Sequence, residues 1–206
     1  MSWQTFFKGS EAEPQTIYQL VDEARDAYRV SLIAARESLA AQYDTLLSEL
    51  LLGVQSEEVP EGFRRMRADF FGKREDGLTT IVSNLDNPRR FRVKREDWQG
   101  LRVECRPLVW NGIDLRTDAD LSDTSAVLAW FERWLDPLDQ RPPDADGLQG
   151  VVHSLIVPDV GPDGDWIVPV DFGSAPLEAF TELVELLRAH GATRLRIESF
   201  EMQRQL

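Results

Sequence analysis

Residues 148–199 read LQGVVHSLIVPDVGPDGDWIVPVDFGSAPLEAFTELVELLRAHGATRLRIES, and this stretch decides the fold class. Its first apolar run, residues 151–157, is rich in β-branched side chains and predicts a strand. Prolines and glycines then turn the chain, and residues 166–170 predict the return strand. Because Pro169 has no N–H to donate, we expect the return strand to lie at a sheet edge.

The second half of this stretch predicts a helix and a final strand. Ser174 is a suitable N-cap, and apolar residues recur at helical spacing as far as Leu187, before Gly191 ends the helix. Residues 193–199 alternate apolar and charged side chains, which is typical of a half-buried strand. Two strands followed by a helix and another strand indicate an α+β domain.

Residues 101–135 show the same order of elements as residues 150–190, although the residues themselves differ. Each stretch predicts two strands, a loop and a helix, and in the first one Asn111-Gly112 predicts a hairpin turn because both residues tolerate positive φ. We therefore predict one mixed or antiparallel sheet built from two ββα-like units, with helices packed on one face. The proline-rich residues 136–147 between the two units predict a loop.

The N-terminal residues carry a helical pattern. Apolar side chains recur at helical spacing from Pro14 to Gly53, so we predict an N-terminal helical segment, residues 1–55, made of one long helix or of two. The leucines near its end are apolar on all sides, which makes residues 32–52 a candidate homodimer contact.

The α+β domain is expected to cover residues 63–206. It begins with residues 63–71, where aromatic and arginine side chains fall on opposite sides of a predicted short helix. The single cysteine of the chain, Cys105, cannot form an internal disulfide, which fits a reducing compartment. Since no apolar run approaches the length of a membrane span, we expect a soluble, cytoplasmic protein.

The charge of the chain is strongly negative and unevenly distributed. The 206 residues carry a net charge of −13, and residues 107–179, with 14 Asp/Glu and 3 Lys/Arg, contribute −11. Nucleic acids and anionic membranes are polyanions, so we expect neither as a partner. Complementary charge favours a basic protein as the partner instead.

Known catalytic and cofactor motifs are missing from the sequence. It contains no phosphate-binding glycine loop, no dinucleotide-binding fingerprint and no nucleophile elbow. His153, His190 and Cys105 are too few for a typical zinc site, and we interpret both histidines as structural. The sequence therefore predicts no cofactor, no metal and no enzymatic activity.

Aspartates form the one cluster that suggests a site. Four of them fall within residues 114–123, a spacing that can suit a cation, but the glycine and glutamate that a calcium loop requires are replaced by Ala119 and Ser125. We expect these carboxylates to lie on a solvated, partner-binding surface, together with an aromatic anchor and an aspartate before a predicted helix. The residues in this prediction are Asp114, Asp118, Asp120, Asp123, Trp110 and Asp171.

Three functional hypotheses remain open from the sequence. The leading one is a non-enzymatic protein-binding module, for example an inhibitor or an antitoxin-like protein, because catalytic motifs are missing and the charge is strongly negative. The first alternative is a hydrolase, or a small-ligand or metal-binding protein, that uses the aspartates of residues 114–123 and Asp171. The second is a structural module that dimerises through residues 32–52.

Overall fold

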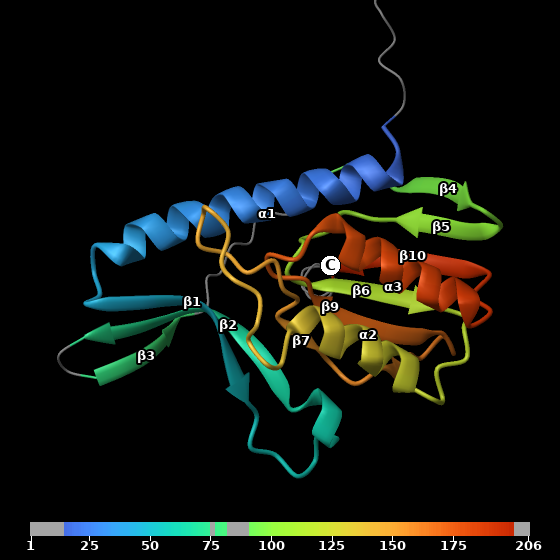
Figure 1. Cartoon of the computed structure of the whole chain (residues 1–206). Coiled ribbons are helices and arrows are strands. Elements are labelled where there is room, and N and C mark those ends of the chain that lie inside the picture. The colour runs from blue at the N-terminus through green and yellow to red at the C-terminus, as the bar shows by residue number, and fades with distance from the viewer. Residues whose placement is uncertain (1–14, 75–76, 82–90, 200–206) are drawn as a thin grey trace, which may run out of the picture.

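The computed structural model describes residues 15–74, 77–81 and 91–199. In this part of the chain one long helix lies across two β-sheets, and two shorter helices cover the larger sheet (Figure 1). In chain order the elements are α1 (Ile17–Ala40), β1 (Thr45–Gly53), the 3-10 helix η1 (Glu61–Phe63), β2 (Arg65–Arg74), β3 (Gly77–Ile81), β4 (Lys94–Trp98), β5 (Leu101–Cys105), β6 (Ile113–Thr117), α2 (Ser125–Leu135), β7 (Ser154–Leu155), β8 (Asp159–Val160), β9 (Trp166–Asp171), α3 (Leu177–Ala189) and β10 (Arg194–Ser199).

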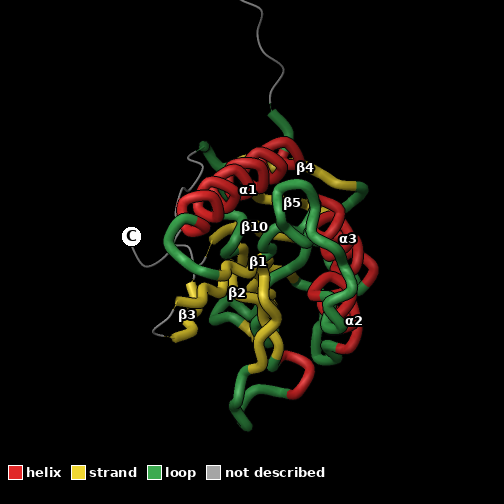
Figure 2. Tube along the Cα trace, turned by 60° about the vertical axis from the view of Figure 1, so that its left-hand side comes forward, coloured by secondary structure: helices red, strands yellow, loops and turns green. Residues whose placement is uncertain are grey.

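The larger sheet is mixed. Its strand order is β4-β5-β10-β6-β9-β7, and β8 also pairs with β9. Strand β10 runs parallel to β5 and antiparallel to β6. Helices α2 and α3 lie side by side on one face of this sheet (Figure 2). The units β5–β6–α2 and β7–β9–α3, closed by β10, confirm the predicted α+β fold class.

The core lies between the larger sheet and its helices. On β5 the side chains of Leu101, Val103 and Cys105 are buried, while Arg102 and Glu104 face the opposite side. This alternation is what a sheet with one covered face requires. An aromatic group at the centre of the core joins the sheet side to α3. Its ring centroids are 4.7 Å apart for Trp110–Phe172 and 5.8 Å apart for Phe172–Phe180.

The smaller sheet corrects the predicted N-terminal helical segment. Helix α1 is a single helix that ends at Ala40, and residues 45–53 form β1, which pairs antiparallel with β2. Strand β2 occupies the region predicted as a short helix at residues 63–71, and β3 pairs with its other side. Leucine has a high helix propensity, but eight cross-strand pairs between β1 and β2 outweigh that local preference.

Two further local predictions are wrong. Strands β5 and β6 do not pair as a hairpin, because β10 lies between them. Strand β9 is not an edge strand, although it contains Pro169. The carbonyl of Pro169 accepts from the N–H of Ile156, so its nitrogen faces the side where β7 ends at Leu155 and β8 begins only at Asp159. The missing N–H therefore falls in a gap of the ladder.

Helix α1 connects the two sheets. It begins with a capping box between Thr16 and Gln19, and the N–H of Ile17 donates to the Glu96 carboxylate of β4 at 3.1 Å. At its other end Arg36 Nε donates to Ser48 Oγ of β1 at 3.1 Å. The two sheets are thus held against one helix. Among the helices that the structure describes, none is long and apolar enough to cross a membrane.

Candidate functional site: a buried charge cluster beside a groove

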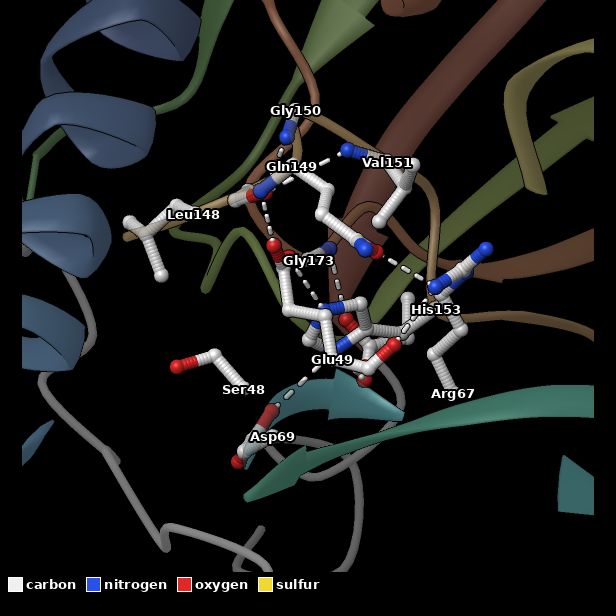
Figure 3. A network of polar contacts seen from close by, with 12 residues as sticks. Ser48, Glu49, Arg67, Asp69, Leu148, Gln149, Gly150, Val151, His153 and Gly173 are labelled. Carbon is white, nitrogen blue, oxygen red and sulfur yellow. Dashed lines mark hydrogen bonds and ion pairs between the residues drawn. The ribbon is translucent and has the colours of Figure 1, made fainter. Parts of the chain in front are cut away.

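Five charged side chains meet where the two sheets touch. Figure 3 shows Glu49 of β1, Arg67 and Asp69 of β2, and His153, the residue before β7. The fifth residue, Asp171, is the last residue of β9. We call these five residues the charge cluster. A backbone bond accompanies it, since the N–H of Arg67 donates to the carbonyl of His153 at 2.7 Å.

His153 is the centre of the cluster. Its side chain is 1% exposed, its Nε2 lies 2.8 Å from Glu49 Oε1, and its Nδ1 lies 3.0 Å from Asp69 Oδ1 and 4.0 Å from Asp171 Oδ2 (Figure 3). Burial alone lowers the pKa of His153, but the hydrogen bonds with Asp69 and Glu49 outweigh burial and hold the pKa well above its usual value. The ring is therefore an imidazolium with a carboxylate on each nitrogen.

The acids around His153 differ in the direction in which their pKa values are shifted. Burial raises the pKa of Glu49, yet its hydrogen bond with His153 leaves it below the usual value. For Asp171 burial dominates and raises the pKa to about 6, despite the opposing effect of the His153 charge. Tyr28 donates to Asp69 Oδ1 at 3.1 Å, and burial together with nearby carboxylates holds the pKa of Tyr28 well above 10.

Backbone geometry at the cluster is unusual. Glu49 has φ 55°, which is rare for a residue other than glycine, although the β1–β2 register continues through the pairs Ser48–Phe70 and Leu50–Ala68 on either side. Strain of this kind is typical of functional sites. Gly173 has φ 50°, and a Cβ there would collide with the His153 ring, so glycine fits this position on two grounds.

Arg67 anchors the small sheet to the end of α2. Its side chain is fully buried, and Nε and Nη2 donate at 2.7 Å to the carbonyls of Leu135 and Asp136. Its Nη1 donates to the Glu49 carbonyl at 2.6 Å and to Asp139 Oδ1 at 3.0 Å. A cation at a helix C-terminus also interacts favourably with the helix dipole. The guanidinium therefore joins β1, β2, α2 and the loop that follows it.

The contacts of the cluster favour a structural role over a catalytic one. A general base needs a ring nitrogen within reach of a substrate proton, but both nitrogens of His153 already contact carboxylates. Within the described ranges, no group of three or more His, Cys, Asp or Glu residues is arranged to hold a metal ion. Burial, followed by the charge of Glu96, raises the pKa of Cys105 to about 12, so its thiolate does not form near neutral pH.

A groove of about 290 Å³ lies beside the cluster. Its lining comes from five consecutive residues of β1, from the loop between α2 and β7, and from Arg36 of α1. The described residues that line it are Arg36, Leu46, Leu47, Ser48, Glu49, Leu50, Asp139, Pro143, Gly147 and Gln149. The N–H of Gln149 donates to the Glu49 carboxylate, so the groove and the charge cluster share Glu49 (Figure 3).

The aspartates predicted to form a solvated surface lie in separate environments. Asp114 is buried on β6, where burial raises its pKa to about 6. Asp118 accepts from the N–H groups of Thr193 and Arg194 at 2.8 and 2.9 Å, and these bonds outweigh partial burial and lower its pKa to about 2. Asp118 thus ties β10 to the end of β6.

The other predicted site residues also have separate positions. Asp120 and Asp123 are exposed and accept from the N–H groups two residues later, as short turns do. Trp110 is 1% exposed, and its indole N–H donates to the carbonyl of Gly173 at 2.9 Å, which places the ring in the core. Of the six predicted residues, Asp171 is the one that belongs to the charge cluster.

Sequence reasoning missed Glu49, Arg67 and Asp69. Glu49 lies in a leucine-rich run beside Ser48, Asp69 lies between Ala68 and Phe70, and Arg67 lies between Met66 and Ala68. A charge at such a position must be paired when the run is buried, and this was the available signal. It could not be used while the two segments were interpreted as helices with solvated faces.

No protein-family model, curated protein or solved structure matches the chain. The role of the cluster and of the groove must therefore be inferred from their own geometry.

Proposed function

We propose that this chain is a non-enzymatic, cytoplasmic protein-binding module that accepts an extended basic segment of another protein along the free edge of β1. The observation that carries this proposal is the groove, which five consecutive residues of an edge strand line. An inhibitor or an antitoxin-like protein is one form that such a module takes.

The lining of the groove favours an extended ligand. Successive side chains of a strand point to opposite faces, so a groove that touches residues 46–50 in sequence runs along the strand edge rather than over one face. Strand β1 has β2 as its one strand neighbour among the described residues. An edge strand presents unpaired N–H and C=O groups, and peptides bind such edges as an added strand.

Charge favours a basic segment. The loop that contributes Asp139, Pro143 and Gly147 to the groove is acidic, since residues 136–147 contain four aspartates and one arginine. The carboxylates of Asp139, Asp144 and Asp146 remain partly exposed. A partner with lysine or arginine beside its extended segment would be steered toward this loop by the −13 charge of the chain.

The charge cluster supports binding by holding β1 in place. Glu49 is fixed by His153 and Gln149, and its carbonyl by Arg67. A strand edge that is rigid before binding loses less conformational entropy when a partner docks. The closed contacts of His153 also favour this structural role over proton transfer.

A short synthetic peptide of alternating lysine and valine tests the proposal by fluorescence anisotropy. We expect binding that weakens as salt is raised and that a glutamate–valine peptide does not reproduce. Leu47→Lys places a cation in the groove and should weaken binding. The matched control is Val160→Lys, since Val160 is 49% exposed on edge strand β8 and Leu47 is 46% exposed.

A second variant addresses the backbone. The N–H groups of Asp44 and Val54 donate to β2, so those of odd-numbered residues such as Leu47 face the groove side. Leu47→Pro should therefore abolish peptide binding while the fold remains. Equal binding by this variant, or by the glutamate peptide, would overturn the proposal. Sedimentation as a dimer that Leu47→Pro dissociates would identify a second copy as the occupant and would also overturn it.

A further inference from the structure

A second, independent feature lies on the face of the larger sheet that the helices leave uncovered. It is a cleft of about 410 Å³, a size typical of small-molecule sites. Its described lining comes from strands β4, β5, β6 and β10 and from Asp165, and it contains the arginines Arg95, Arg102, Arg116, Arg194 and Arg196. Five guanidinium groups in one cleft are unexpected in a chain with a net charge of −13.

The strand register places these arginines beside one another. Arg102 of β5 lies directly opposite Arg194 of β10, and Arg196 of β10 lies directly opposite Arg116 of β6. Neighbouring strands are about 4.8 Å apart, so each pair brings two like charges close together. Like charges directly opposite in a sheet destabilise it. The fold therefore places two pairs of like-charged side chains next to one another.

Carboxylates neutralise this group only in part. Arg95 lies 2.7 Å from Glu104, Arg116 lies 2.6 Å from Glu198, and Arg194 lies 3.0 Å from Asp165 and 3.3 Å from Asp118. The carboxylates nearest Arg196 are 3.8 and 3.9 Å away, too far for strong hydrogen bonds. The guanidinium of Arg102 forms no ion pair or hydrogen bond with any residue that the structure describes. Donors of Arg102 and Arg196 are thus available to a ligand.

We propose that this cleft binds a small phosphorylated molecule, with Arg102 and Arg196 donating to its phosphoryl group. A guanidinium is a planar fork that donates two parallel hydrogen bonds to phosphate oxygens, and a phosphoryl group has enough oxygens for two forks. Asp97 and Asp165 at the same cleft would accept from hydroxyl or amino groups of that molecule. The four carboxylates that line the cleft would repel the repeated phosphates of a nucleic-acid strand, which favours a small molecule.

Pyrophosphate is the probe, followed by thermal unfolding and isothermal titration calorimetry. We expect pyrophosphate to raise the Tm of the full chain beyond the effect of sodium chloride at equal ionic strength. Arg102→Gln should lower the affinity by about tenfold or more, the loss expected for hydrogen bonds to a charged group. Arg188→Gln is the matched control, because Arg188 lies on α3 and pairs with Glu185.

Without ligand, we expect Arg102→Gln to raise the Tm, whereas it should weaken the binding of pyrophosphate. Because Arg102→Gln removes one of two opposed charges, its Tm in the absence of pyrophosphate should rise above that of the wild-type protein. Arg196→Gln should behave in the same way. A pyrophosphate shift that is absent, or that is equal in Arg102→Gln, would overturn the proposal. Binding of a single-stranded oligonucleotide more tightly than pyrophosphate would also overturn it.

Discussion

His153 carries a carboxylate on each ring nitrogen and is 1% exposed, so its charge is balanced entirely inside the protein. Removing charges from water costs several kcal/mol per ion unless geometry and hydrogen bonds compensate. Here the hydroxyl of Tyr28 donates a hydrogen bond to the Asp69 carboxylate, and the N–H of Gln149 donates one to the Glu49 carboxylate. Such a network specifies one arrangement of its neighbours, because most displacements leave a buried charge unpaired.

Gly173 gives the most direct test of how tightly the ring is enclosed. Gly173→Ala introduces a Cβ that collides with His153 and a residue other than glycine at φ 50°, so we expect a loss of about 3 kcal/mol or more in the free energy of unfolding. Gly164→Ala is the control, since φ there is 83° with open space around a Cβ, and it should lose about 1 kcal/mol. Chemical denaturation measures both. Equal losses would mean that the ring moves aside.

Asp171 gives the cluster a pH dependence. Its folded-state pKa, about 6, lies above the usual 3.8, so its ionisation destabilises the fold as pH rises from about 4 to about 6. His153, whose folded pKa is raised, is protonated in both states below its usual pKa and does not contribute in this window. Asp171→Asn should therefore match the wild type near pH 4 and become more stable by about 1 to 2 kcal/mol above pH 6, because 27% exposure moderates the gain.

Denaturation of both proteins across this pH range measures the difference. If Asp171→Asn were less stable than the wild type at pH 7, the Asp171 carboxylate would be stabilising the imidazolium of His153. In that case the effect of the His153 charge would exceed that of burial, opposite to the order inferred here.

At the scale of elements, the contact between β2 and α2 depends on one side chain. Arg67 reaches two carbonyls at the end of α2 and one on β1, and no part of it is exposed. A buried carbonyl group that loses a donor keeps the cost of its removal from water. Arg67 is therefore one hydrogen-bonded link that positions the smaller sheet, beside the apolar contacts of Phe70.

Arg67→Met keeps an unbranched side chain of similar length but removes all of these donors. We expect a loss of about 3 to 5 kcal/mol in the free energy of unfolding, as for other broken buried pairs. Arg65→Met is the control, because Arg65 is exposed on the same strand, and it should change stability by less than about 0.5 kcal/mol. A loss below about 1 kcal/mol for Arg67→Met would show that apolar packing alone docks the sheet.

Local periodicity identified some elements and not others. The helical spacing up to Leu187 predicted α3, and the alternation in residues 193–199 predicted β10. Both elements bury one face, so their apolar residues recur with the period of a helix or a strand. Residues 46–52 contain five leucines around Ser48 and Glu49, a pattern compatible with a buried helix or a buried strand. Pairing with β2 decided between the two, and pairing is not a local property.

At the scale of the molecule, α1 and the charge cluster join the two sheets into one core. The buried face of α1, from Ile17 to Leu32, belongs to the same apolar cluster as the larger sheet, and Phe70 of β2 belongs to it as well. A shared core has no boundary at which one half could unfold alone. Both predicted segments, residues 1–55 and 63–206, contribute side chains to this cluster.

Cooperative unfolding follows from this arrangement. Hydrogen exchange followed by mass spectrometry should give amides of β2 and of β5 the same opening free energy in the wild-type protein, because both open only when the shared core does. In Arg67→Met the β2 amides should exchange at a lower free energy than those of β5. Distinct opening energies already in the wild type would contradict the shared core.

The sequence by itself determined the α+β class, the helices α2 and α3, and strands β9 and β10, since each depends on periodicity or composition within one short segment. Only the tertiary structure decided that residues 45–53 and 65–74 are strands, that β10 enters between β5 and β6, and that Glu49, Asp69 and Asp171 surround His153. These outcomes depend on pairing between segments up to about a hundred residues apart, and such pairing leaves no periodic trace in either segment alone.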